Sequence, residues 1–277
     1  MKCMLSRLFA STAVMLLALS CAGAQVSPEK VAFTRPKITQ PLPFKIGETL
    51  TYEVSFSKLI FSGTIGELKL SVSRPDSNKP DQIQLKAEAI SKGFFPMLFG
   101  LKVRDRYDSL ISEADFGLLT STKLIEEGKV RREQKAVIDR DAGQVTFTDR
   151  DLVNAKSKPK VKQKTTPAWI QDVLSTIYFV RTQPLKEGDV VPIPISDGGE
   201  VYNIEIVAGK REEIKTYAGK FKAIQLNAKV FDGRYVRRSG EMLVWVTNDE
   251  RRIPVHARAK FSGTTVTVGL KKLDSLH

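Results

Sequence analysis

The sequence predicts a mainly β protein: one extended, curved antiparallel sheet (a half-barrel or open barrel) with one amphipathic helix. Three observations predict this fold. Apolar and polar residues alternate over most of the chain, turn-forming residues separate the alternating segments, and only one segment has apolar residues at helical spacing. Because the connections are mostly short and no repeat is visible, we expect a single β-rich domain over residues 46–273.

The first 24 residues have the composition of a secretory signal peptide. Lys2 and Arg7 precede a short apolar run, and Ala22-Gly23-Ala24 places small residues at a signal peptidase site. The apolar run is too short to span a bilayer comfortably. We therefore expect export to the periplasm or cell envelope, with cleavage after Ala24. The residues before Cys21 loosely resemble a lipoprotein cleavage site, so lipidation at Cys21 is the alternative.

A proline-containing leader over residues 25–45 precedes the alternating segments. The first predicted strand carries Leu50, Tyr52, Val54 and Phe56 on one face. The next lies near 65–72, with a bulge or bend at its glycines. Further strands are predicted at 83–89, 101–112, 117–126, 129–138, 144–149, 189–195, 200–208, 221–231, 240–247, 253–261 and 264–272. Turns are indicated at 141–143, 197–199 and 232–233.

The helix is predicted over about 167–182. Thr166 and Pro167 have the residue types of an N-cap and first helical position. Apolar residues then recur at helical spacing from Trp169 to Tyr178, which indicates one buried face. We expect this helix to cover the concave face of the sheet or to plug one end.

Charge favours anionic partners. Without Lys2 and Arg7 the chain has 42 basic against 31 acidic residues, a net charge near +11. In a cell envelope such a protein meets anionic membranes and acidic glycans, and no nucleic acid is expected there. The basic stretch predicted as a solvated loop contributes the candidate contacts Lys156, Lys158, Lys160, Lys162 and Lys164. The alternative is that these charges only decorate outward faces.

Several enzyme classes are disfavoured by what the chain lacks. Both cysteines, Cys3 and Cys21, lie in the signal region, and the histidines are His256 and His277. The mature chain therefore lacks the cysteines for a disulfide framework or a cysteine nucleophile. It also has too few histidines to favour a histidine-rich metal site or a Ser-His-Asp triad. We expect no catalytic residue, metal or cofactor. Asp172 and Asp249 remain single carboxylates, for which a structural role is favoured over general acid–base catalysis.

One apolar segment stands out between Gly93 and Gly100. Its large residues surround Pro96, which discourages a regular strand. The segment is either core or a lip that contacts an acyl chain or membrane, since Phe and Met adapt to irregular ligands. On the second interpretation, the ligand-binding residues are Phe94, Phe95, Met97, Leu98 and Phe99 on the lip, with Trp169 and Tyr178 on the helix lining the cavity.

Several short patterns, in order, resemble the bacterial family of domain of unknown function 3108 (DUF3108). They are IGETLTYEV at 46–54, SGT at 62–64, DVLSTIYFVR at 172–181, AGKFK at 218–222 and VWVTNDERRIPV at 244–255. The resemblance covers about 44–272 and implies an exported, β-rich protein without established activity. By fold analogy it also suggests kinship with curved half-barrel carriers of envelope lipids and lipoproteins.

These observations lead to two functional hypotheses. The first is a non-enzymatic envelope protein that holds a lipid or other apolar ligand in its curved sheet. The alternative is a structural or scaffolding protein with a filled core, whose basic surface contacts anionic glycan or a partner protein.

Overall fold

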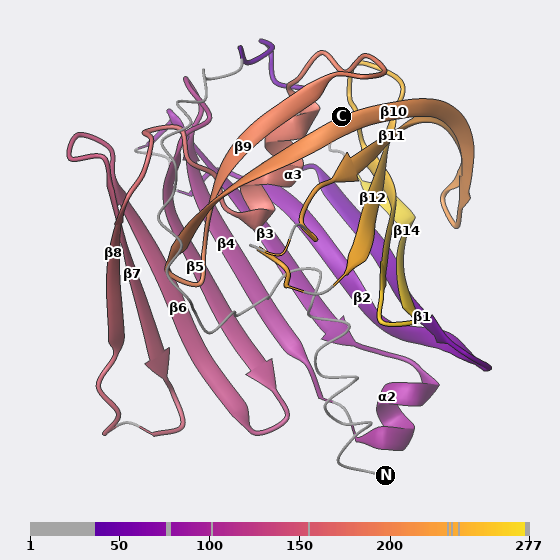
Figure 1. Cartoon of the computed structure of the whole chain (residues 1–277), viewed down its shortest axis with the longest axis horizontal. Coiled ribbons are helices and arrows are strands. Elements are labelled where there is room, and N and C mark those ends of the chain that lie inside the picture. The colour runs from indigo at the N-terminus through magenta and orange to yellow at the C-terminus, as the bar shows by residue number, and fades with distance from the viewer. Residues whose placement is uncertain are drawn as a thin grey trace.

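One antiparallel sheet of fourteen strands organises the protein (Figure 1). The computed structural model describes residues 37–75, 79–100, 102–154, 156–231, 233, 235–237 and 239–274. The predicted signal peptide, Cys21, most of the leader and Asp232 lie outside them. The strands follow the order β8-β7-β6-β5-β4-β3-β2-β1-β14-β13-β12-β11-β10-β9. The predicted fold class is confirmed.

Thirteen of the fourteen strands lie where the alternation predicts them, although β10 runs eight residues past its predicted end at 208. The strands are β1 (Thr49–Lys58), β2 (Phe61–Ser73), β3 (Gln82–Ser91), β4 (Arg104–Ser112), β5 (Leu118–Glu127), β6 (Val130–Asp139), β7 (Gln144–Asp151), β8 (Lys160–Thr165), β9 (Val190–Asp197), β10 (Glu200–Thr216), β11 (Gly219–Ala228), β12 (Gly240–Thr247), β13 (Pro254–Phe261) and β14 (Thr264–Asp274). The predicted bulge is present, because the β1–β2 register shifts between Val54 and Ser55, opposite Gly66 and Thr64. At Gly66 an added Cβ would lie 2.7 Å from the Ile90 carbonyl oxygen, so only glycine fits.

Strand β1 joins the two halves of the sheet. It pairs with β2 on one side and with β14 on the other, from Thr49 opposite Asp274 to Lys58 opposite Thr264, with one register shift between Thr51 and Tyr52. The inward side chains of β1 at Leu50, Tyr52 and Val54 are buried, as the alternation predicts.

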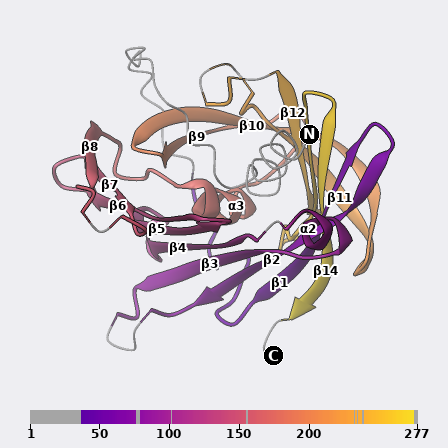
Figure 2. The ribbon, with the colours of Figure 1, turned by 90° about the horizontal axis from the view of Figure 1, so that it is seen from below.

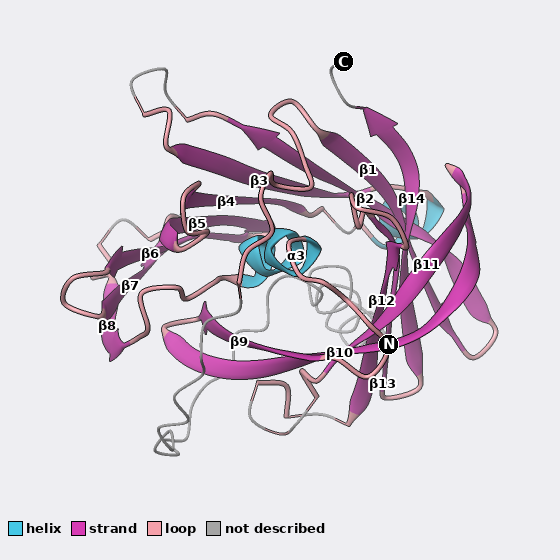
Figure 3. Cartoon of the chain, turned by 90° about the horizontal axis from the view of Figure 1, so that it is seen from above, coloured by secondary structure: helices cyan, strands magenta, loops and turns pink. Residues whose placement is uncertain are grey.

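The sheet curls around helix α3 (Val173–Arg181), which lies inside the ring of strands seen from above and below (Figures 2 and 3). The helix begins six residues later than predicted, and Thr166 is not its N-cap. Asp172 caps it instead, with its carboxylate accepting from the Ser175 amide at 2.7 Å and the Ser175 hydroxyl accepting from the Asp172 amide. This reciprocal capping box outcompetes the Thr166-Pro167 signal because it satisfies two backbone groups.

Both ends of α3 are fixed to the sheet by buried polar contacts. Asp172 accepts a hydrogen bond of 2.5 Å from Ser109 on β4. At the other end Arg181, with no exposed surface, donates to both carboxylate oxygens of Glu48 at 2.6 and 3.0 Å. Arg181 also donates to the carbonyls of Pro43 and Arg251. The helix is therefore a fixed part of the interior.

The predicted basic loop is wrong from residue 160 onward, because β8 is an edge strand paired with β7. Lysines at every second position have the period of a strand, and edge strands are commonly protected by exposed lysines. The other edge is β9, and no backbone ladder joins β8 to β9 among the described residues. Lys162 and Lys164 of β8 reach across the gap and pair with Glu200, the first residue of β10, beside the end of β9, at 2.8 and 3.0 Å.

A second, short helix was not predicted. α2 (Phe94–Phe99) follows β3 and packs against β2. Gly93 and Gly100 flank it with φ values of 108° and 65°, which glycine adopts readily. Pro96 lies in its first turn, where a missing amide hydrogen costs little.

Candidate ligand-binding cavity

An apolar cavity of about 130 Å³ lies between α3 and the strands of the C-terminal half. Its lining is almost entirely hydrocarbon, with Thr176 and Tyr235 contributing the polar side chains. The lining residues among those described are Val173, Thr176, Ile177, Val180, Ile195, Ile204, Ile206, Leu226, Ala228, Val230, Phe231, Tyr235, Val236, Met242, Val244, Val246, Pro254, Ala259 and Phe261. A cavity of this composition favours an apolar occupant over water.

Helix α3 has two apolar faces, and one of them forms a wall of the cavity. Val173, Thr176, Ile177 and Val180 recur at intervals of three and four residues and face the cavity. The residues on the other side pack on β3 and β4, with Leu174 and Tyr178 fully buried there. The helix therefore separates the cavity from the N-terminal half of the core.

The connection from β11 to β12 closes part of the cavity. Val236 is buried, and Phe231 stacks on Phe261 with ring centroids 6.3 Å apart. Tyr235 donates a hydrogen bond of 3.1 Å to Asp197, and burial raises the pKa of this tyrosine well above its usual value. Tyr235 thus directs its hydroxyl to the protein, and its ring is the part that borders the cavity.

Asp197 belongs to a buried polar cluster beside the cavity. It forms an ion pair with Lys123 of β5, and both side chains are almost completely buried. The Lys123 ammonium also lies 5.7 Å from the Tyr107 ring centre. Because Asp197 ends β9, the ion pair holds the C-terminal edge of the sheet against β5, across the gap. The space beside it is only about 10 Å³, too small for a substrate.

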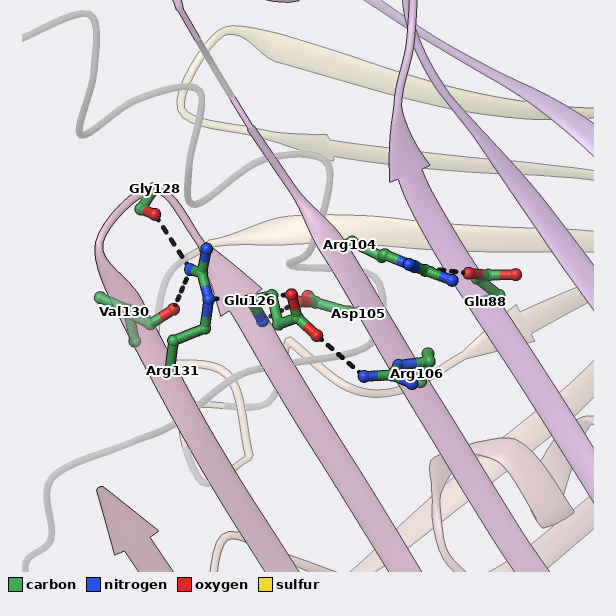
Figure 4. Close-up of polar contacts among 8 residues, drawn as sticks. All are labelled: Glu88, Arg104, Asp105, Arg106, Glu126, Gly128, Val130 and Arg131. Atoms are coloured by element: carbon green, nitrogen blue, oxygen red, sulfur yellow. Dashed lines mark hydrogen bonds and ion pairs between the residues drawn. The ribbon is translucent and has the colours of Figure 1, made fainter. Parts of the chain in front are cut away.

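Two further carboxyl groups lie near the ends of β4 and β5. On the outward face Arg106 pairs with Glu126 at 2.8 Å and Arg104 with Glu88 at 2.9 Å (Figure 4). Asp105 is fully buried and accepts from the Glu126 amide at 2.9 Å. Burial raises the pKa of Asp105 from 3.8 to about 6. Burial, and then the Asp105 charge, raises the pKa of Glu127 from 4.5 to about 7.

The prediction that Trp169 and Tyr178 line the cavity is wrong for this cavity. Trp169 precedes the helix and packs against Phe179 with ring centroids 6.0 Å apart. The rings of Tyr178 and Phe44 pack edge to face, with ring centroids 5.1 Å apart. Both are core residues, because the late start of α3 and its two apolar faces direct them away from the cavity.

Of the apolar segment at 93–100, the described side chains of Phe94 and Met97 do not line the cavity. Phe94 and Met97 of α2 are 61% and 75% exposed, so for these two the core interpretation is wrong. The side chains of Phe95, Leu98 and Phe99 lie outside what the structure describes. The interpretation of this segment as a lip stays a prediction. For Phe94 and Met97 it concerns contacts at the protein surface, not the lining of this cavity.

The predicted basic contacts fall into two groups. Lys156, Lys158 and Lys160 are exposed. Lys162 and Lys164 pair with Glu200 and help to bridge the sheet edges, which reduces what they offer an external anion.

The remaining candidates have local structural roles. Asp172 caps α3, and burial raises its pKa. Asp249 accepts from the Thr247 hydroxyl and from the amides of Arg251 and Arg252, which shapes the turn after β12. His256 packs edge-on to Trp245 with ring centroids 5.1 Å apart, and burial lowers its pKa.

The described residues hold no cluster of three or more metal-ligating side chains. Within the same part of the chain, neither helix is long and apolar enough to cross a bilayer.

Sequence reasoning missed the cavity residues and the two buried ion pairs. The inward positions of β10 to β13 were visible as alternation, but alternation does not distinguish a filled interior from a hollow one. Glu48 and Arg181 are 133 residues apart, so no local pattern links them.

A solved structure of distant sequence shares this fold. A beta-barrel-like protein of domain of unknown function DUF1849 from Brucella abortus is 8% identical, and the match covers 84% of this chain and 98% of that one, with a TM-score of 0.56. A protein with a YmcC-like fold from Bacteroides fragilis is 10% identical over 84% of this chain and 98% of its own, with a TM-score of 0.35, too low to support an argument.

No curated protein matches the sequence. The model of the family described as "Protein of unknown function (DUF3108)" matches residues 51–271. The chain therefore belongs to the DUF3108 family.

Proposed function

We propose that this protein is a non-enzymatic cell-envelope protein that binds an apolar ligand, the acyl chain of a lipid, in the cavity between α3 and strands β9 to β13. The observation that carries the proposal is the cavity itself: about 130 Å³ of space with hydrocarbon walls, between elements fixed by buried contacts.

The cost of this cavity supports a role for it. An unfilled core volume lowers stability by about 24 cal/mol per Å³. A cavity of about 130 Å³ therefore lowers the free energy of unfolding by about 3 kcal/mol relative to a filled core. Dry, apolar cavities of similar size, about 150 Å³, bind small hydrocarbons such as benzene. A single hydrocarbon chain end matches both the volume and the lack of polar partners.

The envelope location rests on the signal-peptide pattern of residues 1–24, with cleavage after Ala24 or lipidation at Cys21. The exposed Lys156, Lys158 and Lys160 would attract anionic head groups or glycan, an effect that weakens as salt screens it.

Native mass spectrometry of the processed protein, followed by organic extraction, tests the proposal. We expect a reproducible lipid mass on the wild type and its loss in Ile177→Trp, which fills the cavity from α3. The matched control is Val137→Trp on the outer face of β6, where the side chain is 43% exposed. The mass of the N-terminal peptide also distinguishes cleavage after Ala24 from lipidation at Cys21.

Two outcomes would overturn the proposal. A clean apo mass over several preparations would favour the scaffold hypothesis and direct the search to glycan and protein partners. Equal lipid retention by Ile177→Trp and the wild type, both folded, would place the lipid outside the cavity.

A further inference from the structure

Exposed apolar side chains gather at one end of the sheet. The connections β1–β2 (59–60), β3–β4 (92–103), β5–β6 (128–129) and β7–β8 (152–159) all leave the sheet at the same end, spread across the lower part of Figure 1 from β8 to β1; we name this the α2 end. Its exposed large apolar residues are Leu59, Ile60, Phe61, Phe94, Met97, Val130, Leu152 and Val153. At the opposite end, the connections 74–81, 113–117 and 140–143 expose no large apolar side chain among the described residues, and the exposed ones at that end are Ile46, Val190 and Tyr217.

The β1–β2 hairpin is the strongest feature of this end. Leu59 and Ile60 are 92% and 91% exposed at its tip. Leu59 also has a φ of 55°, a left-handed conformation that costs free energy for a branched side chain and favours glycine or asparagine. Exposure and backbone strain both disfavour leucine here on folding grounds. Strain of this kind tends to mark functional positions.

Charge at the two ends differs in sign. These four connections, all in the N-terminal half, contain five lysines (Lys92, Lys102, Lys129, Lys156 and Lys158) and no aspartate or glutamate, and the β11–β12 connection (229–239) at the same end adds four basic residues and Asp232. The three opposite connections contain three basic and five acidic residues. Apolar tips surrounded by lysines are the pattern of a surface that inserts into an anionic bilayer, since lysines attract head groups while apolar side chains enter the acyl boundary.

We propose that the α2 end docks onto an anionic phospholipid bilayer, with Leu59, Ile60, Phe94 and Met97 inserted. This surface is separate from the cavity, but the two are neighbours. The β11–β12 connection, which supplies Phe231 and Val236 to the cavity lining, also leaves the sheet at this end. Docking would therefore bring the cavity close to a source of acyl chains.

Vesicle sedimentation tests the proposal, in a Cys21→Ser background so that no lipid anchor contributes. We expect the protein to bind phosphatidylglycerol-rich vesicles, and to bind them more weakly in about 1 M salt, where the Debye length is about 3 Å. Leu59→Gly combined with Ile60→Ser removes the apolar tip while suiting the turn, and should lower the partition coefficient at least about tenfold. Phe94→Ser with Met97→Ser should also lower it.

Two controls make the result specific. Val190→Ser removes a half-exposed valine from the start of β9, at the other end of the sheet, and should leave binding unchanged. A tryptophan introduced by Ile60→Trp should shift its emission to the blue on anionic vesicles and be quenched by brominated acyl chains. A purely structural role for the hairpin predicts neither change.

Absence of binding to anionic vesicles, or equal binding by the hairpin variant and Val190→Ser, would overturn docking. A dimer that depends on Leu59 and Ile60, without vesicle binding, would instead assign the surface to a second copy of the chain. The two proposals fail separately, because Ile177→Trp should lose the cavity lipid but keep vesicle binding, and the hairpin variant should do the reverse.

Discussion

Replacing Ala228 by leucine should make the protein more stable and less able to hold a ligand. Ala228 lies on β11 and borders the cavity. The substitution adds three carbon groups, worth about 0.8 kcal/mol each when buried, or about 2.4 kcal/mol. Ordering the leucine side chain costs about 0.5–1 kcal/mol. The net gain of about 1.5 kcal/mol lies below the roughly 3 kcal/mol that the unfilled volume of about 130 Å³ represents.

A thermal unfolding scan and a fluorescent apolar probe measure the two effects together. For a chain of this size, about 1.5 kcal/mol corresponds to a rise in Tm of about 3–6 °C. The affinity for N-phenyl-1-naphthylamine should fall in the same variant. Ala87→Leu on β3 is the matched control, because Ala87 is buried in the packed N-terminal half, where overpacking should lower stability by about 1–3 kcal/mol.

The outcomes separate the steps of the reasoning. If Ala228→Leu and Ala87→Leu both lower Tm, the space beside Ala228 does not accept a side chain and the cavity argument fails. If Ala228→Leu raises Tm while the probe still binds as to the wild type, the probe site lies elsewhere.

Three further predictions follow from buried contacts. Glu48→Gln leaves the buried Arg181 charge without its counter-ion and should cost about 3–5 kcal/mol in urea unfolding. The folded protein holds the pKa of Asp105 at about 6 rather than 3.8, so stability should fall as pH rises from about 4 to 7. In Asp105→Asn the loss of stability between about pH 4 and 7 should be smaller by on the order of 2–3 kcal/mol. A pH profile equal to that of the wild type would refute this prediction. Gly199→Ala, with φ at 81° and its Cβ 2.7 Å from the Phe147 ring, should lower Tm by several degrees; an unchanged Tm would contradict it.

Strand positions were predictable because their signal is local. Residues such as Leu50, Tyr52 and Val54 alternate with polar neighbours, and each strand except β8 pairs with the next one along the chain, so short connections define most of the order. The exception is the pairing of β1 with β14, which no local pattern predicts.

The helix shows where local signals conflict. Thr166-Pro167 and Asp172-x-x-Ser175 both suit a helix start, and the second forms because Asp172 is also held by Ser109 of β4. That tertiary contact lies outside any window around the helix. The same limit explains why Trp169 was placed on the wrong side: its direction depends on where the helix begins.

The candidate surface was predicted only in part. The lysines and the residues of α2 were identifiable by composition. The tip at Leu59 and Ile60 was not, because two aliphatic residues between alternating segments read as ordinary strand. Their significance depends on exposure and on the backbone conformation of Leu59, which only the structure supplies.

The seam between β1 and β14 has a kinetic consequence. All other neighbouring strands follow one another in sequence, whereas these two are separated by more than 200 residues, from Lys58 to Thr264. A chain made from its N-terminus can form the β1–β8 meander early, but β1 keeps an open edge until β14 has been made. Such long-range pairing slows folding and leaves an unpaired strand exposed to other chains meanwhile. Completion of the sheet therefore waits for the synthesis of its last strand, which gives the nascent protein a long period in which a chaperone can hold β1 unpaired.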